Sequence, residues 1–113
     1  METDFLTQKV IACAIEVHKQ LGPGLLESSY ESCLMYELNE AGISAKKQVL
    51  LPIKYKGIAI DAGYRLDILL PNQLIIELKA VDRLAPIYTA QLITYLKLSS
   101  IKTGLLINFN EQK

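Results

Sequence analysis

The chain has little of what marks a secreted, membrane-bound or zinc-thiolate protein. It contains no tryptophan, one histidine and two cysteines, and Cys13 and Cys33 lack the paired spacing of a zinc site. It shows no signal peptide, no basic transit sequence and no run of about 20 apolar residues. We therefore expect a cytoplasmic protein that does not enter a membrane, with both cysteines as buried thiols.

An excess of basic charge is also missing. The sequence holds 12 Lys and Arg against 12 Asp and Glu, which gives a formal net charge of zero. This argues against a protein that coats nucleic acid nonspecifically, although an enzyme with acids in its site needs only a local rim of cations. The cations available for such a rim, most of them expected to be solvated surface charge, are Lys46, Lys47, Lys54, Lys56, Arg65, Arg83 and Lys97.

Length and composition bound the architecture. With 113 residues, half of them hydrophobic, residues 1–113 are expected to form one domain with a substantial core. The chain leaves no room for a separate recognition module. Selection of a target would then come from loops, from a homodimer or from a partner.

The spacing of apolar residues predicts an α/β protein. Steps of three and four residues predict helices over Asp4–Leu21, from about Leu26 to Ala41, and from Pro86 to about Ser99. Alternating segments predict strands over Gln48–Tyr55, Ile58–Ala62, Tyr64–Leu70, Leu74–Ala80 and Lys102–Phe109. A helix between the last two strands favours a parallel crossover. We expect a mixed sheet flanked by helices, with the order α-α-β-β-β-α-β.

Charged residues interrupt two neighbouring strands that are otherwise apolar. Asp67 lies on the first, and Glu77-Leu78-Lys79 lies on the second. A three-residue connection through Pro71-Asn72-Gln73 would place Asp67 opposite Glu77 and Arg65 opposite Lys79. A two-residue turn would instead pair Asp67 with Ile76.

In the first register the two carboxylates would have Cβ atoms roughly 5 Å apart. Such a pair repels unless a cation or a proton lies between its members. A hard divalent ion such as Mg²⁺ prefers a few carboxylate oxygens plus waters, and the Lys79 ammonium could orient or deprotonate one of those waters. The alternative is a structural, salt-bridged role for the three side chains.

A string of short motifs resembles a known family. The segment Gly24-Leu25-Leu26-Glu27-Ser28-Ser29-Tyr30 is similar to the signature of the GxxExxY proteins, which resemble the PD-(D/E)XK nuclease superfamily. The resemblance covers nearly the whole chain. Its further motifs are His18 with Leu21-Gly22-Pro23-Gly24, Tyr55-Lys56-Gly57, Tyr64-Arg65-Leu66-Asp67, Ile76-Glu77-Leu78-Lys79-Ala80, Ala90-Gln91 with Tyr95-Leu96-Lys97, and Gly104-Leu105-Leu106-Ile107-Asn108-Phe109.

The resemblance implies a restriction-endonuclease-like fold and a role for individual residues. Asp67 and Glu77 would bind the metal together with the Leu78 carbonyl, and Lys79 would be the catalytic lysine. Glu27 would be an acid from a preceding helix, although an anion at a helix start is also favoured by the helix dipole. Gln91 would face the site from the last helix, where its alternative role is that of a surface amide. The family usually carries His at the position of Tyr88, so in this chain the imidazole, and any proton transfer assigned to it, is missing there.

Two functions from different classes follow. The first is Mg²⁺- or Mn²⁺-dependent hydrolysis of a phosphodiester bond in nucleic acid, with DNA favoured over RNA. The second is a catalytically silent module of the same fold that binds nucleic acid or a protein partner. A dinucleotide-binding enzyme is disfavoured, because Gly22-Pro23-Gly24 follows a helix rather than a strand.

Overall fold

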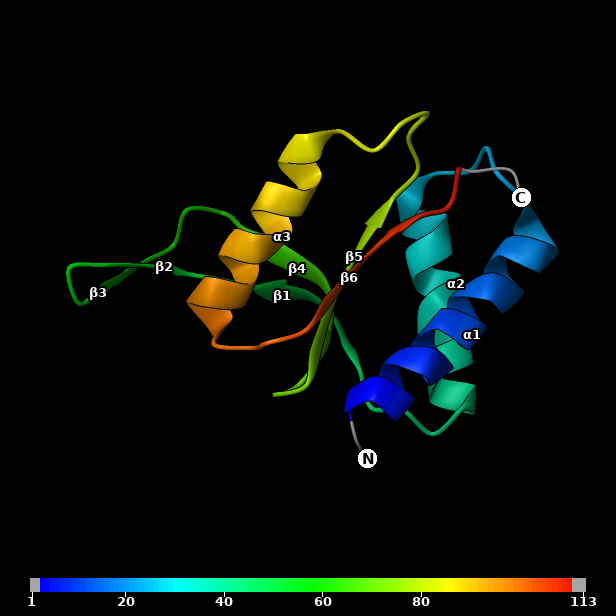
Figure 1. The fold of residues 1–113 in the computed structure, drawn as a ribbon, viewed down its shortest axis with the longest axis horizontal. Coiled ribbons are helices and arrows are strands. Elements are labelled where there is room, and N and C mark those ends of the chain that lie inside the picture. Colours follow the sequence, from blue (N-terminus) through cyan, green and yellow to red (C-terminus); the bar gives the residue numbers. More distant parts are fainter. Residues whose placement is uncertain (1–2, 111–113) are drawn as a thin grey trace.

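A four-stranded mixed sheet forms the centre of the computed structural model, which describes residues 3–110. The elements follow in the order α1 (Thr3–Leu21), α2 (Glu27–Glu40), β1 (Lys46–Leu50), β2 (Ile53–Tyr55), β3 (Ile58–Ile60), β4 (Arg65–Leu70), β5 (Leu74–Lys79), α3 (Pro86–Ser99) and β6 (Gly104–Asn108). The sheet has the order β1-β4-β5-β6, in which β5 and β6 are parallel and the other neighbours antiparallel. Helices α1 and α2 cover one face and α3 covers the other (Figure 1). The predicted mixed sheet flanked by helices is confirmed.

The prediction of one strand over Gln48–Tyr55 is wrong. The segment is divided between β1 in the main sheet and β2, which pairs with β3 in a separate two-stranded sheet. Leu51 still donates its N–H to the Tyr64 carbonyl at 2.9 Å, but Pro52 has no N–H with which to continue the ladder. With this hairpin set aside, the main sheet keeps the predicted order α-α-β-β-β-α-β.

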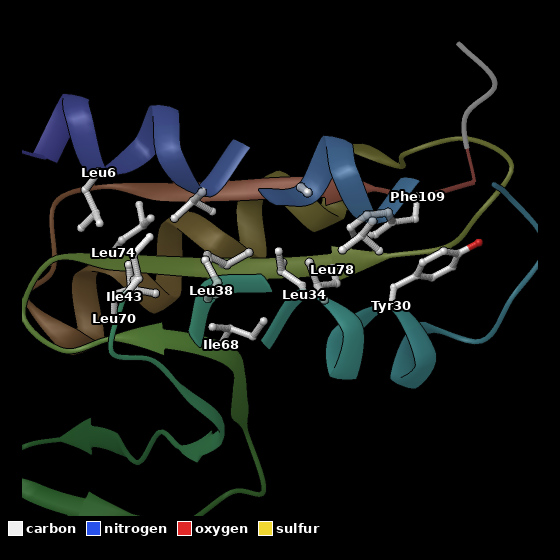
Figure 2. Close-up of a cluster of buried hydrophobic side chains, with 14 residues drawn as sticks. Leu6, Tyr30, Leu34, Leu38, Ile43, Ile68, Leu70, Leu74, Leu78 and Phe109 are labelled. Atoms are coloured by element: carbon white, nitrogen blue, oxygen red, sulfur yellow. The ribbon is translucent and has the colours of Figure 1, made fainter. Parts of the chain in front are cut away.

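The larger core cluster fills the space between the sheet and the helices α1 and α2. Alternate residues of β4 and β5 point into it, as expected for strands with a period of two. Figure 2 shows the cluster, whose buried members are Leu6, Val10, Ala14, Val17, Tyr30, Leu34, Leu38, Ile43, Ile68, Leu70, Leu74, Ile76, Leu78 and Phe109. This packing holds the β4–β5 hairpin from one side.

A smaller cluster holds the hairpin from the other side. It joins Leu51, Leu66 and Ile75 of the sheet region to Leu92 and Tyr95 of α3. Gly104 permits this approach, because a Cβ there would lie 2.9 Å from a methyl carbon of Leu92. Residues that share the face of Ile75, among them Glu77 and Lys79, therefore point towards α3.

The two cysteines are half-buried, so the prediction that both are buried thiols is wrong. Cys13 donates weakly to the Glu37 carbonyl, with Sγ 3.7 Å from the oxygen, and burial raises the pKa of its thiol. Each lies at the margin of the core, where helix spacing alone does not separate a buried position from a half-buried one. Within residues 3–110, no helix combines the length and apolarity needed to cross a bilayer.

Tyr30 fixes the start of α2 against the end of β6. Its ring stacks on Phe109 with centroids 4.6 Å apart and planes 5° apart. Its hydroxyl donates to the Gly22 carbonyl at 2.6 Å and accepts from the Leu25 N–H at 3.1 Å. The glycine-containing loop that leads to Glu27 is therefore tied to a buried ring.

Tyr30→Phe should keep the ring stack but remove both hydrogen bonds of the hydroxyl. Because the Gly22 carbonyl and the Leu25 N–H lose their partner, we expect the free energy of unfolding to fall by about 1–2 kcal/mol. Urea unfolding followed by circular dichroism measures this. The control is Tyr36→Phe, since Tyr36 is 62% exposed and should tolerate the change. Equal effects from the two substitutions would contradict a special role for the Tyr30 hydroxyl.

Candidate functional site

The β4–β5 hairpin has the register that brings the two acids together. Leu70 pairs with Leu74, Leu69 with Ile75 and Ile68 with Ile76, so the connection is the three-residue one. Gln73 donates its N–H to the Leu70 carbonyl at 2.9 Å to close the turn. The two-residue alternative, which would have paired Asp67 with Ile76, is excluded.

Backbone pairing between these strands stops one residue short of the acids. In the described residues the β4–β5 ladder does not continue to Asp67 and Glu77, nor to the predicted pair of Arg65 and Lys79. Side chains replace it. The Asp67 N–H donates to Glu77 Oε2 at 3.0 Å, and the Leu78 N–H donates to Asp67 Oδ2 at 2.8 Å. Each carboxylate thus accepts a hydrogen bond from the backbone of the other strand.

Burial raises the pKa of Glu77. The side chain is only 8% exposed, and loss of solvent is the largest cause of a rise to about 8 from an ordinary value of 4.5. The hydrogen bond from the Asp67 backbone and the charge of Lys79 oppose the rise, whereas the charge of Asp67 adds to it. At neutral pH the pair therefore holds a proton that a cation could displace.

Lys79 lies beside the acids and over an aromatic ring. Its Nζ is 4.5 Å from the centroid of Tyr88, within the range of a cation–π interaction. The Tyr88 ring thus contacts the ammonium from α3.

A groove is lined by α3, by Tyr64 just before β4 and by Ile53 at the start of β2. Its volume is about 370 Å³, and Tyr64, Gln91 and Tyr95 are among the residues that form its wall. Tyr64 and Tyr95 meet edge to face with centroids 6.1 Å apart. Burial, followed by the charge of Glu77, raises the pKa of Tyr95. Gln91 lines the groove together with Tyr95, and among residues 3–110 no hydrogen bond joins it to Lys79, so its place at the site stays a prediction.

Glu27 approaches the end of β5 rather than the two acids. Its carboxylate accepts the Ala80 N–H at 3.3 Å and is exposed, and it makes no side-chain cap of α2. Nowhere in residues 3–110 do three or more His, Cys, Asp or Glu side chains gather as metal ligands. The structure therefore brings Asp67, Glu77 and Lys79 together and leaves Glu27 at the edge of the site.

Two further residues of the site, which lie near Asp67, were not predicted from the sequence. Glu31 is 9% exposed, and Gln48 donates from Nε2 to Glu31 Oε2 at 2.7 Å and to Asp67 Oδ1 at 3.4 Å. Glu31 follows Glu27 by four residues and lies on the same face of the helix, so this spacing could have indicated that Glu31 also lies near the site. The role of Gln48 could not be read from the sequence, because it depends on the pairing of β1 with β4.

The donor set suits a hard divalent cation. Glu77 accepts the Asp67 N–H on Oε2, while Asp67 accepts the Leu78 N–H on Oδ2 and the Gln48 amide on Oδ1. Because an ionised carboxylate has about four lone-pair sites, both groups keep lone pairs for a further partner. Two carboxylate oxygens, a main-chain carbonyl and waters form the kind of ligand set that Mg²⁺ accepts. The raised pKa of Glu77 marks a site where added positive charge would be favourable.

Comparison with known proteins assigns the family. A family model described as the PD-(D/E)XK nuclease superfamily matches residues 4–113. The chain belongs to this superfamily. Neither the curated proteins nor the solved structures contain a match. PD-(D/E)XK membership agrees with the restriction-endonuclease-like arrangement of the mixed sheet and points to nucleic-acid cleavage that depends on a divalent metal. The narrower GxxExxY assignment stays a prediction.

The pKa of Glu77 predicts how stability varies with pH in metal-free protein. An acid whose pKa is about 8 when folded and 4.5 when unfolded favours the folded state while protonated. Its contribution is complete below about pH 4.5 and is lost as pH rises through 8, by up to a few kcal/mol. Glu77→Gln should flatten this fall, so that the variant exceeds the natural protein in stability at pH 8.

Urea unfolding in the presence of a chelator, at intervals from pH 5 to pH 9, measures this dependence. The control is Glu40→Gln, because Glu40 is exposed at the end of α2. If the Glu77→Gln variant loses stability with pH as steeply as the natural protein, Glu77 is not the group responsible.

Proposed function

We propose that residues 1–113 act as one nuclease-like domain that hydrolyses phosphodiester bonds in DNA with Mg²⁺ or Mn²⁺. The observation that carries the proposal is a pair of hydrogen bonds at the point where β4 and β5 stop pairing: the Asp67 N–H donates to Glu77, and the Leu78 N–H donates to Asp67. Lys79 follows Glu77 by two residues along the same strand and points to the same face. A cytoplasmic setting belongs to the proposal, since the free cysteines suit a reducing compartment.

Asp67, Glu77 and the Leu78 carbonyl would hold the ion, and Glu27 is the candidate for a second ion or an added ligand. When bound, the ion would polarise a phosphate oxygen and supply an activated water. Asp67 and Glu77 are already oriented by backbone donors, so little rearrangement precedes binding. Deprotonation of Glu77 accompanies it, because the acid must be ionised to serve as a ligand.

Lys79 would place the reacting groups. Its ammonium, held against the Tyr88 ring, can donate to the nucleophilic water or to a phosphate oxygen. With Tyr rather than His at position 88, the chain has no imidazole there to act as a general base. Positioning by Lys79, rather than proton transfer at position 88, is therefore the role assigned to this pair.

The nucleic acid would approach along the groove of Tyr64, Gln91 and Tyr95, with Gln91 able to donate to a phosphate oxygen. Exposed lysines on β1 and on the β2–β3 hairpin, namely Lys46, Lys47, Lys54 and Lys56, offer the local positive charge that a neutral chain needs. We propose a homodimer as the source of further contact area.

A second candidate is a silent module of the same fold that binds nucleic acid or a protein. Two observations favour it: the net charge is zero, and no group of three acidic or other ligand side chains forms within residues 3–110. Metal binding separates the two candidates, since a binding module has no need of it.

Isothermal titration with Mn²⁺ and Mg²⁺ at millimolar concentration tests the metal site. We expect the natural protein to bind, and Glu77→Gln to bind at least about 10-fold more weakly because one ligand has lost its charge. Glu40→Gln should bind as the natural protein does, since Glu40 lies on an exposed part of α2. Absence of binding by the natural protein would favour the silent module.

Cleavage of labelled DNA and RNA, with Mn²⁺ present, tests the role of Lys79. Lys79→Ala should lower the cleavage rate by about 10²–10⁴-fold while Mn²⁺ binding persists, because the residue acts on water or phosphate rather than on the ion. The matched control is Lys97→Ala, on the exposed surface of α3. Cleavage that survives Lys79→Ala removes this lysine from the mechanism.

A further inference from the structure

Gln48 has a left-handed backbone in the middle of a β-strand. Its φ is +54°, although its neighbours Lys47 and Val49 pair with Ile68 and Leu66 of β4. The register places Gln48 across from Asp67, and the ladder skips this pair. The left-handed region is unfavourable for a residue with a Cβ, and strain of this kind persists where the surroundings hold it, often at functional sites.

The side-chain amide of Gln48 serves two acids from different elements. Its Nε2 donates to Glu31 Oε2 at 2.7 Å and to Asp67 Oδ1 at 3.4 Å, and an amide nitrogen carries the two hydrogens needed. The other oxygen of Asp67 accepts the Leu78 N–H from the opposite strand. Donors on β1 and β5 therefore hold both oxygens of Asp67, which fixes the plane of its carboxylate.

The second acid that Gln48 contacts, Glu31, is a buried residue of α2. The hydrogen bond from Gln48 to Glu31 is the shorter of the two that this amide makes. A neutral amide lets two carboxylates share one nitrogen without adding a cation that would compete for a metal. The residue with the strained backbone, Gln48, is thus also the residue whose side chain links α2 to the acid pair.

We propose that Gln48 is a positioning residue that orients Asp67 for the metal and ties it to Glu31. The inference rests on the proposed function, in which Asp67 is a metal ligand. Groups that act on a metal through one of its ligands typically change metal affinity by about 10–100-fold. The proposal therefore concerns the affinity for the ion, and not the stability of the fold.

Gln48→Gly separates these two effects, because glycine accepts the left-handed backbone while the amide is lost. We expect its Mn²⁺ affinity, measured by titration calorimetry, to fall by about 10–100-fold. Its urea midpoint should be equal to or above that of the natural protein. The matched control is Asn72→Gly, which relieves the same kind of conformation, with φ of +64°, in the β4–β5 turn. It should keep the natural affinity.

Unchanged Mn²⁺ affinity in Gln48→Gly overturns the proposal, provided that the natural protein binds Mn²⁺. A weaker affinity accompanied by a lower urea midpoint also overturns it, because Gln48 would then be structural. An equal loss of affinity in Asn72→Gly does the same.

Nuclear magnetic resonance of metal-free protein keeps the bridge testable even if Mn²⁺ does not bind. The side-chain amide signal of Gln48 is identified by its loss in Gln48→Gly. We expect it to shift in Asp67→Asn and in Glu31→Gln, and to stay in place in Asn72→Gly. Failure of Mn²⁺ binding by the natural protein would count against the proposed function, whereas an amide signal that moves in neither acid variant overturns the bridge itself.

Discussion

The arrangement of the candidate site depends on the point at which β4 and β5 stop pairing. Where the β4–β5 ladder ends, the N–H groups of Asp67 and Leu78 would be left without partners, and the two carboxylates accept them. The backbone thereby holds two carboxyl groups together, and solvent is largely excluded from Glu77. Burial is the main cause of the raised pKa of Glu77, and the charge of Asp67 adds to it.

Packing on both faces of the sheet keeps this arrangement in place. On one side, Ile68, Ile76 and Leu78 are fixed against α1 and α2 in the larger core cluster. On the other, Ile75 packs with Leu92 and Tyr95 of α3. Along β5 the side chains alternate, so the apolar residues that anchor the first face place Glu77 and Lys79 on the second. The packing of the core therefore also orients these two site residues.

Much of this could be predicted from the sequence, because the decisive signals are local. Alternation predicted the two strands, and the three-residue connection, one of two alternatives that the sequence left open, is the one that places Asp67 beside Glu77. Alternation also predicted a single strand over Gln48–Tyr55, whereas the chain leaves the main sheet at Pro52. Gln48 could not be assigned, since its contacts join β1, β4 and α2, which are distant in sequence.

The hairpin of β2 and β3 has a different relation to the rest of the chain. Within residues 3–110 its strands pair only with each other, and it extends away from the body of the molecule (Figure 1). Its length and side chains can therefore change during evolution without altering the alignment of β1, β4 and β5. The hairpin is therefore a part of this small domain in which new binding preferences can be selected while the arrangement of β1, β4 and β5 is preserved.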